Sequence, residues 1–420
     1  MQGPFDVIIV GAGAAGLACA AELLQHGKKI VVLEARDRVG GRIHTLYLPE
    51  SPVPVELGAE FIHGDPAELL HLTNGSQIPF YDGCDNHLLL QGDKLRSVPN
   101  FWDQLGKVMK RLDRGLKADR SLREFIEKSK GIDSRTRRLF TAFVEGFHSA
   151  DLAVMGEKGL ADAEQSDEED LNESLMFRLP LGYERLLKRL SQKIPNPEAL
   201  IRLSMRVRRV EWKRGEVTLK CESALSGRGE TFRAKKAVIT VPLGVLKADL
   251  SRGLEWAPVP GGLESALTGV HMGDVQRLVF RFRSRFWEQL SKEPVGFLHT
   301  GPEYYFPTWW TFMPMRTPHL VAWQGGPKAR ELAAVTHELR VEAALRTLSA
   351  LTGKPLRFLN AQMEACHGHD WSNDPFCWGA YSYIGVGGMN GAARLRKPFD
   401  DTIYLAGEHT ASGPNRGTVG

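Results

Sequence analysis

A cluster of glycines followed by one acidic residue carries the clearest chemical signal in this 420-residue chain. Gly11, Gly13 and Gly16 follow an apolar run, and Glu34 ends a second apolar run, Ile30 to Leu33. In a dinucleotide-binding turn the first glycine permits a tight turn, the second admits a pyrophosphate, and the third lets helix and strand pack closely. An acid after the second strand binds a ribose hydroxyl and disfavours a 2′-phosphate. The pattern predicts a site for FAD or NAD(H) rather than NADP(H).

The elements that must position these residues can be read on either side of them. Val7 to Val10 is a continuous apolar run, as expected of a strand buried on both faces, and a helix with an apolar face follows until Gly27. With Ile30 to Leu33 this makes one βαβ unit. The helix would begin near Ala14 and Ala15, so that its free N–H groups and positive dipole end face the phosphates. The alternative is a glycine-rich turn that binds nothing.

The residues after the second strand select the cofactor. Arg38 to Arg42 reads RVGGR, which resembles the second glycine motif of flavoproteins with two dinucleotide-binding domains. The resemblance implies FAD, with Glu34 on the adenosine ribose and Arg42 near the phosphates. It also places Ala35, Arg36 and Gly41 in the cofactor site.

Further segments, in chain order, are similar to motifs of the flavin-containing amine oxidases, the family of polyamine and monoamine oxidases. They are Gly58 to Gly64, Ala237 to Gly244, Phe286-Trp287, Trp371 to Ser382 and Gly407 to Thr410.

The resemblance implies further contacts to FAD. Glu408 would accept a hydrogen bond from a ribityl hydroxyl, and Val207 would meet the adenine through its backbone. Ala380 stands where monoamine oxidases carry the cysteine that links flavin covalently, so we expect noncovalent FAD. The remaining positions implied for the cofactor site are Trp371, Gly407 and Thr418.

Two aromatic side chains and a glycine form the expected substrate pocket. By resemblance His63 lies in the substrate channel, and Tyr381 lines an aromatic cage whose ring face attracts the amine's positive charge. The usual partner of this tyrosine falls at Gly417, so the pocket looks closer to that of polyamine oxidases. The alternatives are a structural, hydrogen-bonded His63 and a core Tyr381 with its hydroxyl paired.

Arg277 is the main departure from the family pattern. It falls where the family carries a lysine that holds a water at flavin N5, and we predict it to be catalytic together with Tyr381 and His63. Arginine stays charged and directs its donors in a plane, so it cannot act as a neutral base.

The chemistry implied by the resemblance is oxidation of an amine C–N bond. A neutral amine gives a hydride from its α-carbon to flavin N5, the imine hydrolyses, and dioxygen reoxidises the flavin to give hydrogen peroxide. The alternatives are an FAD-dependent desaturase or porphyrinogen-type oxidase, and a flavin-binding protein with impaired turnover, the latter motivated by Arg277. An L-amino-acid oxidase is disfavoured because the Gly58 segment offers no arginine for a carboxylate, although one could come from elsewhere.

We predict an α/β fold in which a Rossmann-like FAD-binding domain is interleaved with an α+β substrate domain. The FAD domain would comprise residues 1–65, 195–260 and 385–420. The substrate domain would comprise 66–194, largely helical, and 261–384, a sheet with helices.

Local patterns predict several elements of the substrate domain. Ser121 to Glu124 reads as a capping box, Asp133 or Ser134 as the next helix cap with Phe147 inward, and Ala161 to Glu173 as a mobile loop. Residues 278–283 alternate as in a half-buried strand. The aromatic-rich stretch Tyr304 to Phe312 fits a pocket wall or a sheet core equally well.

The composition of the chain argues against several classes of protein. The five cysteines are scattered and form no C-x-x-C pair, which favours the reducing cytoplasm over a disulfide framework. Lys94 to Arg138 is basic and Glu145 to Glu173 acidic, and mutual attraction of the two is a better interpretation than nucleic-acid binding. We predict no stable membrane insertion and no particular oligomeric state. The segment Cys366 to Asp370 contains residue types that bind metals, but we predict no metal site there. The predicted partners of the protein are a small-molecule amine and O₂.

Overall fold

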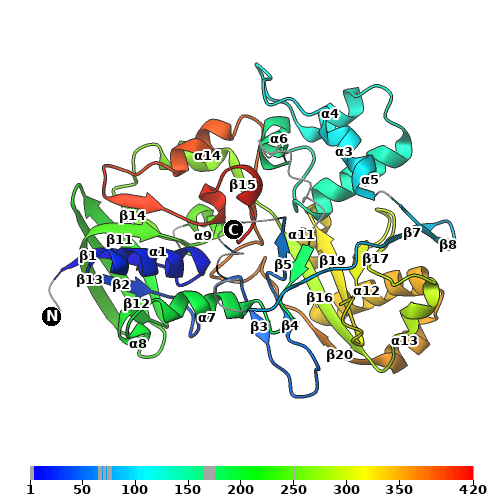
Figure 1. Ribbon diagram of the computed structural model, residues 1–420. Helices are drawn as coiled ribbons and strands as arrows, with labels where there is room; N and C mark the ends of the chain where they lie inside the picture. Colours follow the sequence, from blue (N-terminus) through cyan, green and yellow to red (C-terminus); the bar gives the residue numbers. More distant parts are fainter. Residues whose placement is uncertain are drawn as a thin grey trace.

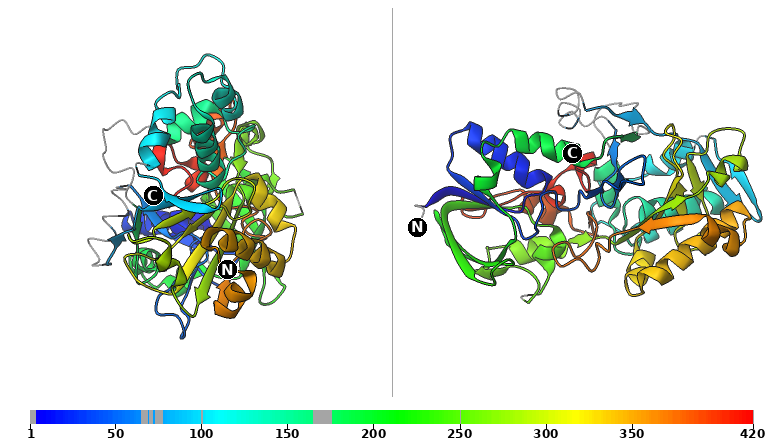
Figure 2. Two further views of the ribbon diagram at one scale, coloured as in Figure 1. Left: turned by 90° about the vertical axis from the view of Figure 1, so that its right-hand side faces the viewer. Right: turned by 90° about the horizontal axis from the view of Figure 1, so that it is seen from below.

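The computed structural model describes residues 4–64, 69, 72, 78–99, 101–164, 176–249 and 251–419. Two large sheets lie at opposite ends of the molecule, and the C-terminal segment lies between them (Figure 1; Figure 2). The first sheet has eight strands in the order β10-β2-β1-β13-β12-β11-β14, with β22 paired to β13. Its strands are β1 (Phe5–Val10), β2 (Ile30–Leu33), β10 (Ile201–Arg202), β11 (Met205–Lys213), β12 (Glu216–Ser223), β13 (Gly229–Ile239), β14 (Glu255–Ala257) and β22 (Ile403–Leu405).

The predicted βαβ unit is confirmed. β1 pairs in parallel with β2, and α1 (Ala14–Gln25) connects them. Val7 and Ile9 pack into a core with α1, whereas Ile8 and Val10 pack into the core on the opposite face. Both faces of β1 are therefore buried, which is why its apolar run is continuous rather than alternating. The Rossmann-like fold class is confirmed.

The first sheet draws its strands from all three segments predicted for the FAD domain, while the domain boundaries stay a prediction. One helix departs from the prediction. α7 (Glu184–Gln192), expected in the substrate domain, buries Leu186, Leu187 and Leu190 in the same core as Leu17 of α1. Figure 1 shows α7 next to α1. Its apolar stripe faces the nucleotide-binding core, and helical periodicity alone could not say which core it would meet.

The second sheet has seven strands in the order β20-β16-β19-β18-β17-β7-β8. They are β20 (Met363–His367), β16 (Val275–Phe282), β19 (His319–Gly325), β18 (Thr308–Trp310), β17 (Phe297–His299), β7 (His87–Gln91) and β8 (Lys94–Ser97). The segment 66–194 was predicted to be largely helical, yet it contributes β7 and β8 to this sheet. Most of its described elements are helices, as predicted, and β7 was not foreseen because it finds its partner, β17, about 200 residues away in sequence.

The expectation of a half-buried strand at residues 278–283 was also wrong. Leu278, Phe280 and Phe282 pack into one core, and Val279 packs into a second core on the other face of β16. An interior strand of a sheet that is covered on both faces has no solvent face, so polar and apolar residues need not alternate. Residues of helices α11 (Pro327–Ala333), α12 (His337–Thr352) and α13 (Leu356–Gln362) pack in the same core as Phe280 and Phe282 of this sheet.

The aromatic-rich stretch serves both of its predicted roles, one on each face. Trp309 is fully buried in the core with Phe280, whereas Trp310 packs in the other core and lines the cavity described below. Successive side chains of a strand point to opposite faces, so neighbouring tryptophans are separated in this way.

A helical layer covers one end of the second sheet (Figure 1). It comprises α3 (Phe101–Met109), α4 (Leu122–Lys128), α5 (Ser134–Gly146) and α6 (Glu157–Glu164). Ser121 caps α4 by accepting from Glu124 N at 3.2 Å, and Asp133 caps α5, as predicted. Phe147, predicted to point inward, is 39% exposed. Residues 161–164 belong to α6 rather than to a loop, and residues 165–173 lie outside the described part of the chain.

Short elements connect these layers. Three small sheets pair β3 with β4, β5 and β6 with β9, and β15 with β21. The remaining bounds are β3 (Thr45–Leu46), β4 (Val55–Glu56), β5 (Phe61–His63), β6 (Tyr81–Asp82), β9 (Met176–Arg178), α8 (Pro197–Leu200), α9 (Leu243–Lys247), α10 (Leu263–Thr268), β15 (Val270–Met272), η1 (Phe286–Leu290), β21 (Ser382–Ile384), α14 (Met389–Leu395), η2 (Glu408–Thr410) and η3 (Gly413–Asn415).

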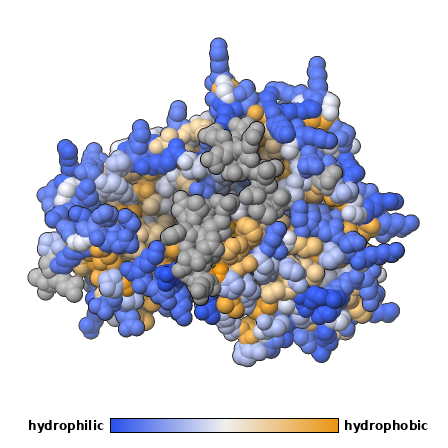
Figure 3. Space-filling model, in the orientation of Figure 1, coloured by the Kyte–Doolittle hydropathy of each residue, from blue (hydrophilic) through white to orange (hydrophobic). Residues whose placement is uncertain are grey.

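The face of the molecule in Figure 3 is mostly hydrophilic and shows hydrophobic residues in separate patches. Among the described residues, no helix is both long enough and apolar enough to span a membrane.

Candidate active site

The glycine turn between β1 and α1 forms one wall of a cavity of about 1560 Å³. Gly11 has a φ of +109°, and a Cβ there would meet Thr240 Oγ1 at 2.6 Å. A Cβ on Gly16 would collide with the Gly11 carbonyl oxygen, whereas a Cβ on Gly13 would meet only Gly40 O, at 3.9 Å. The first and third glycines thus allow close packing, and the second keeps open space beside the cavity. These are the three separate roles expected of a pyrophosphate-binding turn.

The amino end of α1 supplies donors to the same wall. The first hydrogen bond of the helix runs from Leu17 N to Gly13 O, so the N–H groups of Ala14, Ala15 and Gly16 take no part in the helical ladder. No side chain caps this end. An anion in the cavity would meet free N–H groups and the positive end of the helix dipole.

Glu34 is held at the cavity edge by backbone groups. Its Oε2 accepts from Ala12 N at 2.7 Å and its Oε1 from Arg36 N at 2.9 Å, and the residue is only 6% exposed. Burial raises the pKa of this carboxyl. Ala35 and Arg36 line the cavity beside it. The arrangement suits the predicted acceptor for ribose hydroxyls.

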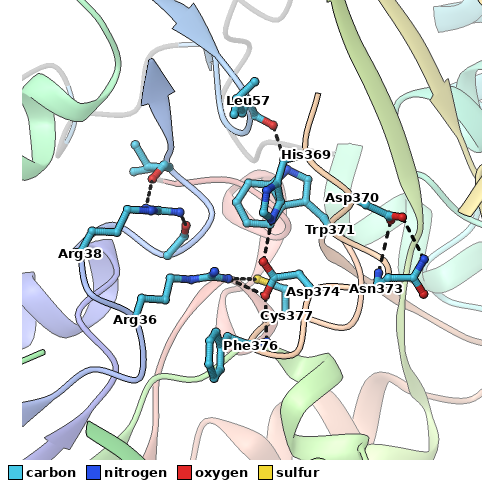
Figure 4. A network of polar contacts seen from close by, with 12 residues as sticks. Arg36, Arg38, Leu57, His369, Asp370, Trp371, Asn373, Asp374, Phe376 and Cys377 are labelled. Carbon is cyan, nitrogen blue, oxygen red and sulfur yellow. Dashed lines mark hydrogen bonds and ion pairs between the residues drawn. The ribbon is translucent and has the colours of Figure 1, made fainter. Parts of the chain in front are cut away.

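Arg36 connects this wall to the segment after β20 (Figure 4). Its Nη2 donates to Asp374 Oδ1 at 2.7 Å, and Asp374 Oδ2 lies 2.6 Å from His369 Nε2. Burial alone would raise the pKa of Asp374, but its hydrogen bonds from His369 and Arg36 hold it well below the usual range. Trp371 donates its indole N–H to Leu57 O at 2.8 Å and lines the cavity.

This network accounts for the ligand-like residues Cys366 to Asp370. His369 is bound to Asp374, and Asp370 accepts from Gln276 and Asn373. Within the described ranges, no group of three or more His, Cys, Asp or Glu side chains is arranged to hold a metal.

The arginine of the second glycine motif contacts the C-terminal segment directly. Arg42 Nη1 donates to Glu408 Oε1 at 2.9 Å and to Ala380 O at 2.6 Å. Glu408 Oε2 accepts from the N–H and hydroxyl of Ser382 at 3.1 and 2.6 Å. A carboxylate offers about four lone-pair sites, so Oε1 can still accept one donor from the cavity. Glu34 and Glu408, far apart in sequence, therefore line one cavity.

The other predicted cofactor positions line this cavity too. Gly41 has a φ of +58° and lies over Gly13, and Val207 lies at an irregularity in the pairing of β11 with β12. The cavity lining also includes Gly407, Gly417 and Thr418. The contacts of these residues with FAD stay predictions.

The far end of the cavity is aromatic. Tyr381 donates its hydroxyl to Phe147 O at 2.6 Å, and a Cβ on Gly417 would meet the Tyr381 ring at 3.4 Å. The ring of His63 lies 5.2 Å from that of Phe147. Burial lowers the pKa of His63 to about 4, so the imidazole is neutral at pH 7. Tyr381 therefore shows a feature of each alternative: its hydroxyl is paired, and it lies in the pocket wall.

Arg277 is held in a buried ion cluster. Its Nη1 donates to Gly58 O at 2.8 Å and its Nη2 to Glu60 Oε2 at 2.5 Å, and Glu60 also pairs with Arg178. The indole N–H of Trp310 donates to the same Oε2 at 3.2 Å. Burial lowers the pKa of Arg277 to about 10, which leaves it charged at pH 7. The arginine expected to hold a water is therefore anchored by protein groups, and it is only 4% exposed although it lines the cavity.

Sequence reasoning missed the residues that complete this end of the cavity. Glu60 and Arg178 received no role, although each is a charged residue within an apolar segment, a signal of a buried ion pair. Phe147 was assigned to the core. Nothing in the sequence indicated that Arg178 and Arg277 would share one carboxylate.

The chain matches a known protein family over almost its whole length. The pattern of the family described as flavin containing amine oxidoreductase matches residues 14–419. A rice protein named lysine-specific histone demethylase 1 homolog 2 is 29% identical over 96% of this chain, which spans 54% of that protein. Polyamine oxidase 2 of Arabidopsis thaliana is 26% identical over 97% of this chain and 84% of its own length.

Solved structures show the same fold. Cyclohexylamine oxidase from Brevibacterium oxydans superposes with a TM-score of 0.80 at 20% identity, covering 99% of this chain and 96% of that one. A putrescine oxidase bound to putrescine gives 0.79 at 19% identity with the same coverage. The chain belongs to the flavin-containing amine oxidoreductases.

Proposed function

We propose that this protein is an oxidase that binds FAD noncovalently, oxidises the C–N bond of a small-molecule amine, and uses O₂ as the acceptor with release of hydrogen peroxide. One observation carries the proposal: the glycine turn, Glu34 and Glu408 share a single cavity with Tyr381 and His63. The residues fit FAD, because Gly13 leaves space at the helix end and Glu34 is fixed at the edge. FAD, when bound, supplies the hydride acceptor.

The aromatic end of the cavity favours an uncharged amine. Arg277 lines the cavity and shares the carboxylate of Glu60 with the buried Arg178, so this group of three side chains has more cations than anions. Glu56, which faces the cluster from β4, has its pKa raised by burial to about 7, and its oxygens are bound by Thr45 and Tyr183 N. An ammonium ion beside such a wall is disfavoured relative to the neutral amine. The neutral amine is also the form whose α-carbon can release a hydride.

Tyr381 and His63 would position the amine rather than exchange protons with it. Burial raises the pKa of Tyr381 above its ordinary value, and His63 is neutral, so neither carries charge at pH 7. The ring of Tyr381 is held by its bond to Phe147 O. A fixed ring face and a neutral imidazole can orient an amine without holding it as a cation.

Anaerobic mixing of the FAD-bound protein with a panel of monoamines and polyamines tests the function. Bleaching of the flavin absorbance by at least one amine, followed by peroxide formation when air is admitted, is the expected result. A protein that binds FAD and is bleached by no amine would overturn the proposal, and would favour the alternative of a flavin-binding protein with impaired turnover.

We further propose that the protein works in a reducing compartment, the cytoplasm. The support is that Cys19, Cys84, Cys221, Cys366 and Cys377 are all free thiols. Fractionation of cells that make the protein would test this, and recovery from an oxidising compartment would contradict it.

A further inference from the structure

A pair of histidines lies in the cavity wall away from the residues discussed above. His87 begins β7 and His299 ends β17, two strands that pair in parallel. His87 Nδ1 lies 2.8 Å from His299 Nε2, and His87 Nε2 lies 2.7 Å from Asp85 Oδ1. Asp85 also accepts from the indole of Trp102 at 2.9 Å. The three side chains form one hydrogen-bonded chain from the protein surface inward, because Asp85 is 42% exposed and His87 only 3%.

Aromatic rings hold the two imidazoles in one orientation. Phe101 and Phe297 stack parallel to His87 with centroid distances of 4.2 and 4.8 Å. His299 is nearly coplanar with His87, at an interplanar angle of 6°. Neither ring can turn out of this plane without breaking the stack, so the hydrogen-bond geometry is fixed.

The hydrogen bonds between these three side chains set which nitrogen of each imidazole carries the proton. An ionised Asp85 can only accept, so His87 Nε2 bears a hydrogen. In the neutral form of His87, Nδ1 then has a lone pair and accepts from His299 Nε2–H. The remaining nitrogen, His299 Nδ1, is left as an acceptor, and the Thr308 hydroxyl lies 3.4 Å from it. That distance makes the bond a weak one.

His299 is accessible from inside the cavity. His299 and Thr308 both line it and both retain accessible surface. Burial lowers the pKa of His299 well below its ordinary value, which keeps the ring neutral. Glu303, on the loop after β17, lines the same end and is exposed. Two acceptors, one neutral and one charged, therefore face this end of the cavity.

An aromatic wall connects this end to the reacting end. From His63 the ring contacts pass to Phe61, Trp310, Phe297 and His299, with centroid distances of 5.8, 5.6, 6.2 and 6.2 Å. The wall offers an apolar surface to the middle of a bound molecule. The carboxylate of Glu60, next to Phe61 in sequence, is occupied by two arginines.

Charge alone does not decide whether the far group is a cation. Glu303 favours a cation, but Arg135 and Arg138 of α5 also line the cavity and are exposed. The chemistry shared by His299 and Glu303 is acceptance of a hydrogen bond. A donor on the far group, either a hydroxyl or a second amino group, would satisfy both of these acceptors.

We propose that His299, with its tautomer set by Asp85 through His87, selects amine substrates that carry a second hydrogen-bond donor beyond an apolar spacer. The proposal rests on the proposed amine oxidase function and names the class of amine. His299 is the specificity-determining contact, and Asp85 and His87 are positioning residues.

The test uses the full-length FAD-bound protein and three amines of equal chain length, over a series of lengths. One ends in a hydroxyl, one in a second amino group, and one in a methyl group. Dissociation constants are measured by perturbation of the oxidised flavin spectrum, and kcat and KM by peroxide release. At the best length, a donor-terminated amine should bind roughly three- to tenfold tighter than the methyl-terminated one, the value of one added hydrogen bond.

Three variants distinguish the effect of the hydrogen-bonded series Asp85–His87–His299 from general effects of substitution on the protein. His299→Phe keeps a stacked ring and should abolish the preference, chiefly through KM. Asp85→Asn, at an exposed position, no longer imposes one tautomer on His87 and should reduce the preference in part. Asp93→Asn removes a carboxylate from the β7–β8 turn of the same hairpin and should leave it unchanged.

The outcomes distinguish this inference from the proposed function. The inference is overturned if His299→Phe still prefers the donor-terminated amines, or if the unaltered protein shows no such preference at any length. In either case, bleaching of the flavin by an amine would still support the proposed function. If no amine bleaches the flavin, the function fails, and the dissociation constants alone decide whether His299 binds a donor. A preference for the diamine only, or for the amino alcohol only, identifies the donor.

Discussion

Replacing Glu60 by glutamine should destabilise the protein more than removing either of its arginine partners. Glu60 is 6% exposed and is the shared counter-charge of Arg178 and Arg277. Glutamine keeps the shape but removes the carboxylate that both buried guanidiniums contact, and the remaining carboxyl that faces them, Glu56, has its pKa raised by burial to about 7. Breaking a buried ion pair by removing one partner costs about 3–5 kcal/mol. Glu60→Gln should lie at or above the upper end of that range, because two cations lose their partner.

Arg277→Met provides the informative comparison. It removes one guanidinium but leaves Glu60 paired with Arg178, so the remaining charges balance. We expect it to cost less than Glu60→Gln, and the double variant to cost less than the sum of the two, since neighbouring sites are coupled. Glu255→Gln is the matched surface control, because Glu255 and its partner Arg209 are 42% and 40% exposed. An exposed pair contributes about 0–1 kcal/mol.

The assay is urea unfolding of the FAD-free variants, followed by far-UV circular dichroism and intrinsic fluorescence. Coincidence of the two transitions is required before a free energy of unfolding is assigned. If Glu60→Gln costs no more than Glu255→Gln, the cluster is not the buried, charged unit described here.

Three further predictions follow from the same geometry. Gly16→Ala should abolish FAD retention, because its Cβ would collide with the Gly11 carbonyl, whereas Gly106→Ala in α3, with no atom within 4 Å, should retain FAD on gel filtration. His409 is 1% exposed, and burial lowers its pKa from 6.5 to about 4. The free energy of unfolding should therefore fall as the pH falls from 6.5 to 4, because the unfolded chain takes up a proton that the folded chain resists. His409→Leu should reduce this fall by about 2–3 kcal/mol when the free energy of unfolding is measured across that pH range. Arg277→Lys should change the rate of flavin reoxidation by O₂ more than the dissociation constant for the amine, and stopped-flow traces with an unchanged reoxidation rate would count against a role in that step.

Much of the nucleotide-binding half could be predicted from sequence because its signals are local. The strand, the glycine turn, the helix and Glu34 follow one another within about thirty residues, and each has its own physical requirement. Glu408 could be placed in the same site only through the family resemblance. Its direct bond to Arg42 joins positions 366 residues apart, which no local pattern could indicate.

The substrate half was less predictable because its interactions join distant segments. The cluster of Glu60 with Arg178 and Arg277 draws on β9, β16 and the residue just before β5, and the pair of His87 and His299 draws on two strands. Each of these residues looks unremarkable by itself. The failure at β16 has the same origin, since whether both faces of a strand are covered depends on elements elsewhere in the chain.

The most direct test of the account is the FAD content and affinity of the full-length protein and of its Glu34→Gln and Glu408→Gln variants. We predict that the protein purifies yellow with one FAD per chain, or takes it up when FAD is added. We further predict that each variant binds FAD more weakly and that denaturation releases the flavin from the chain. A colourless protein that cannot be reconstituted, or unchanged affinity in both variants, would contradict a single FAD held between these two carboxylates.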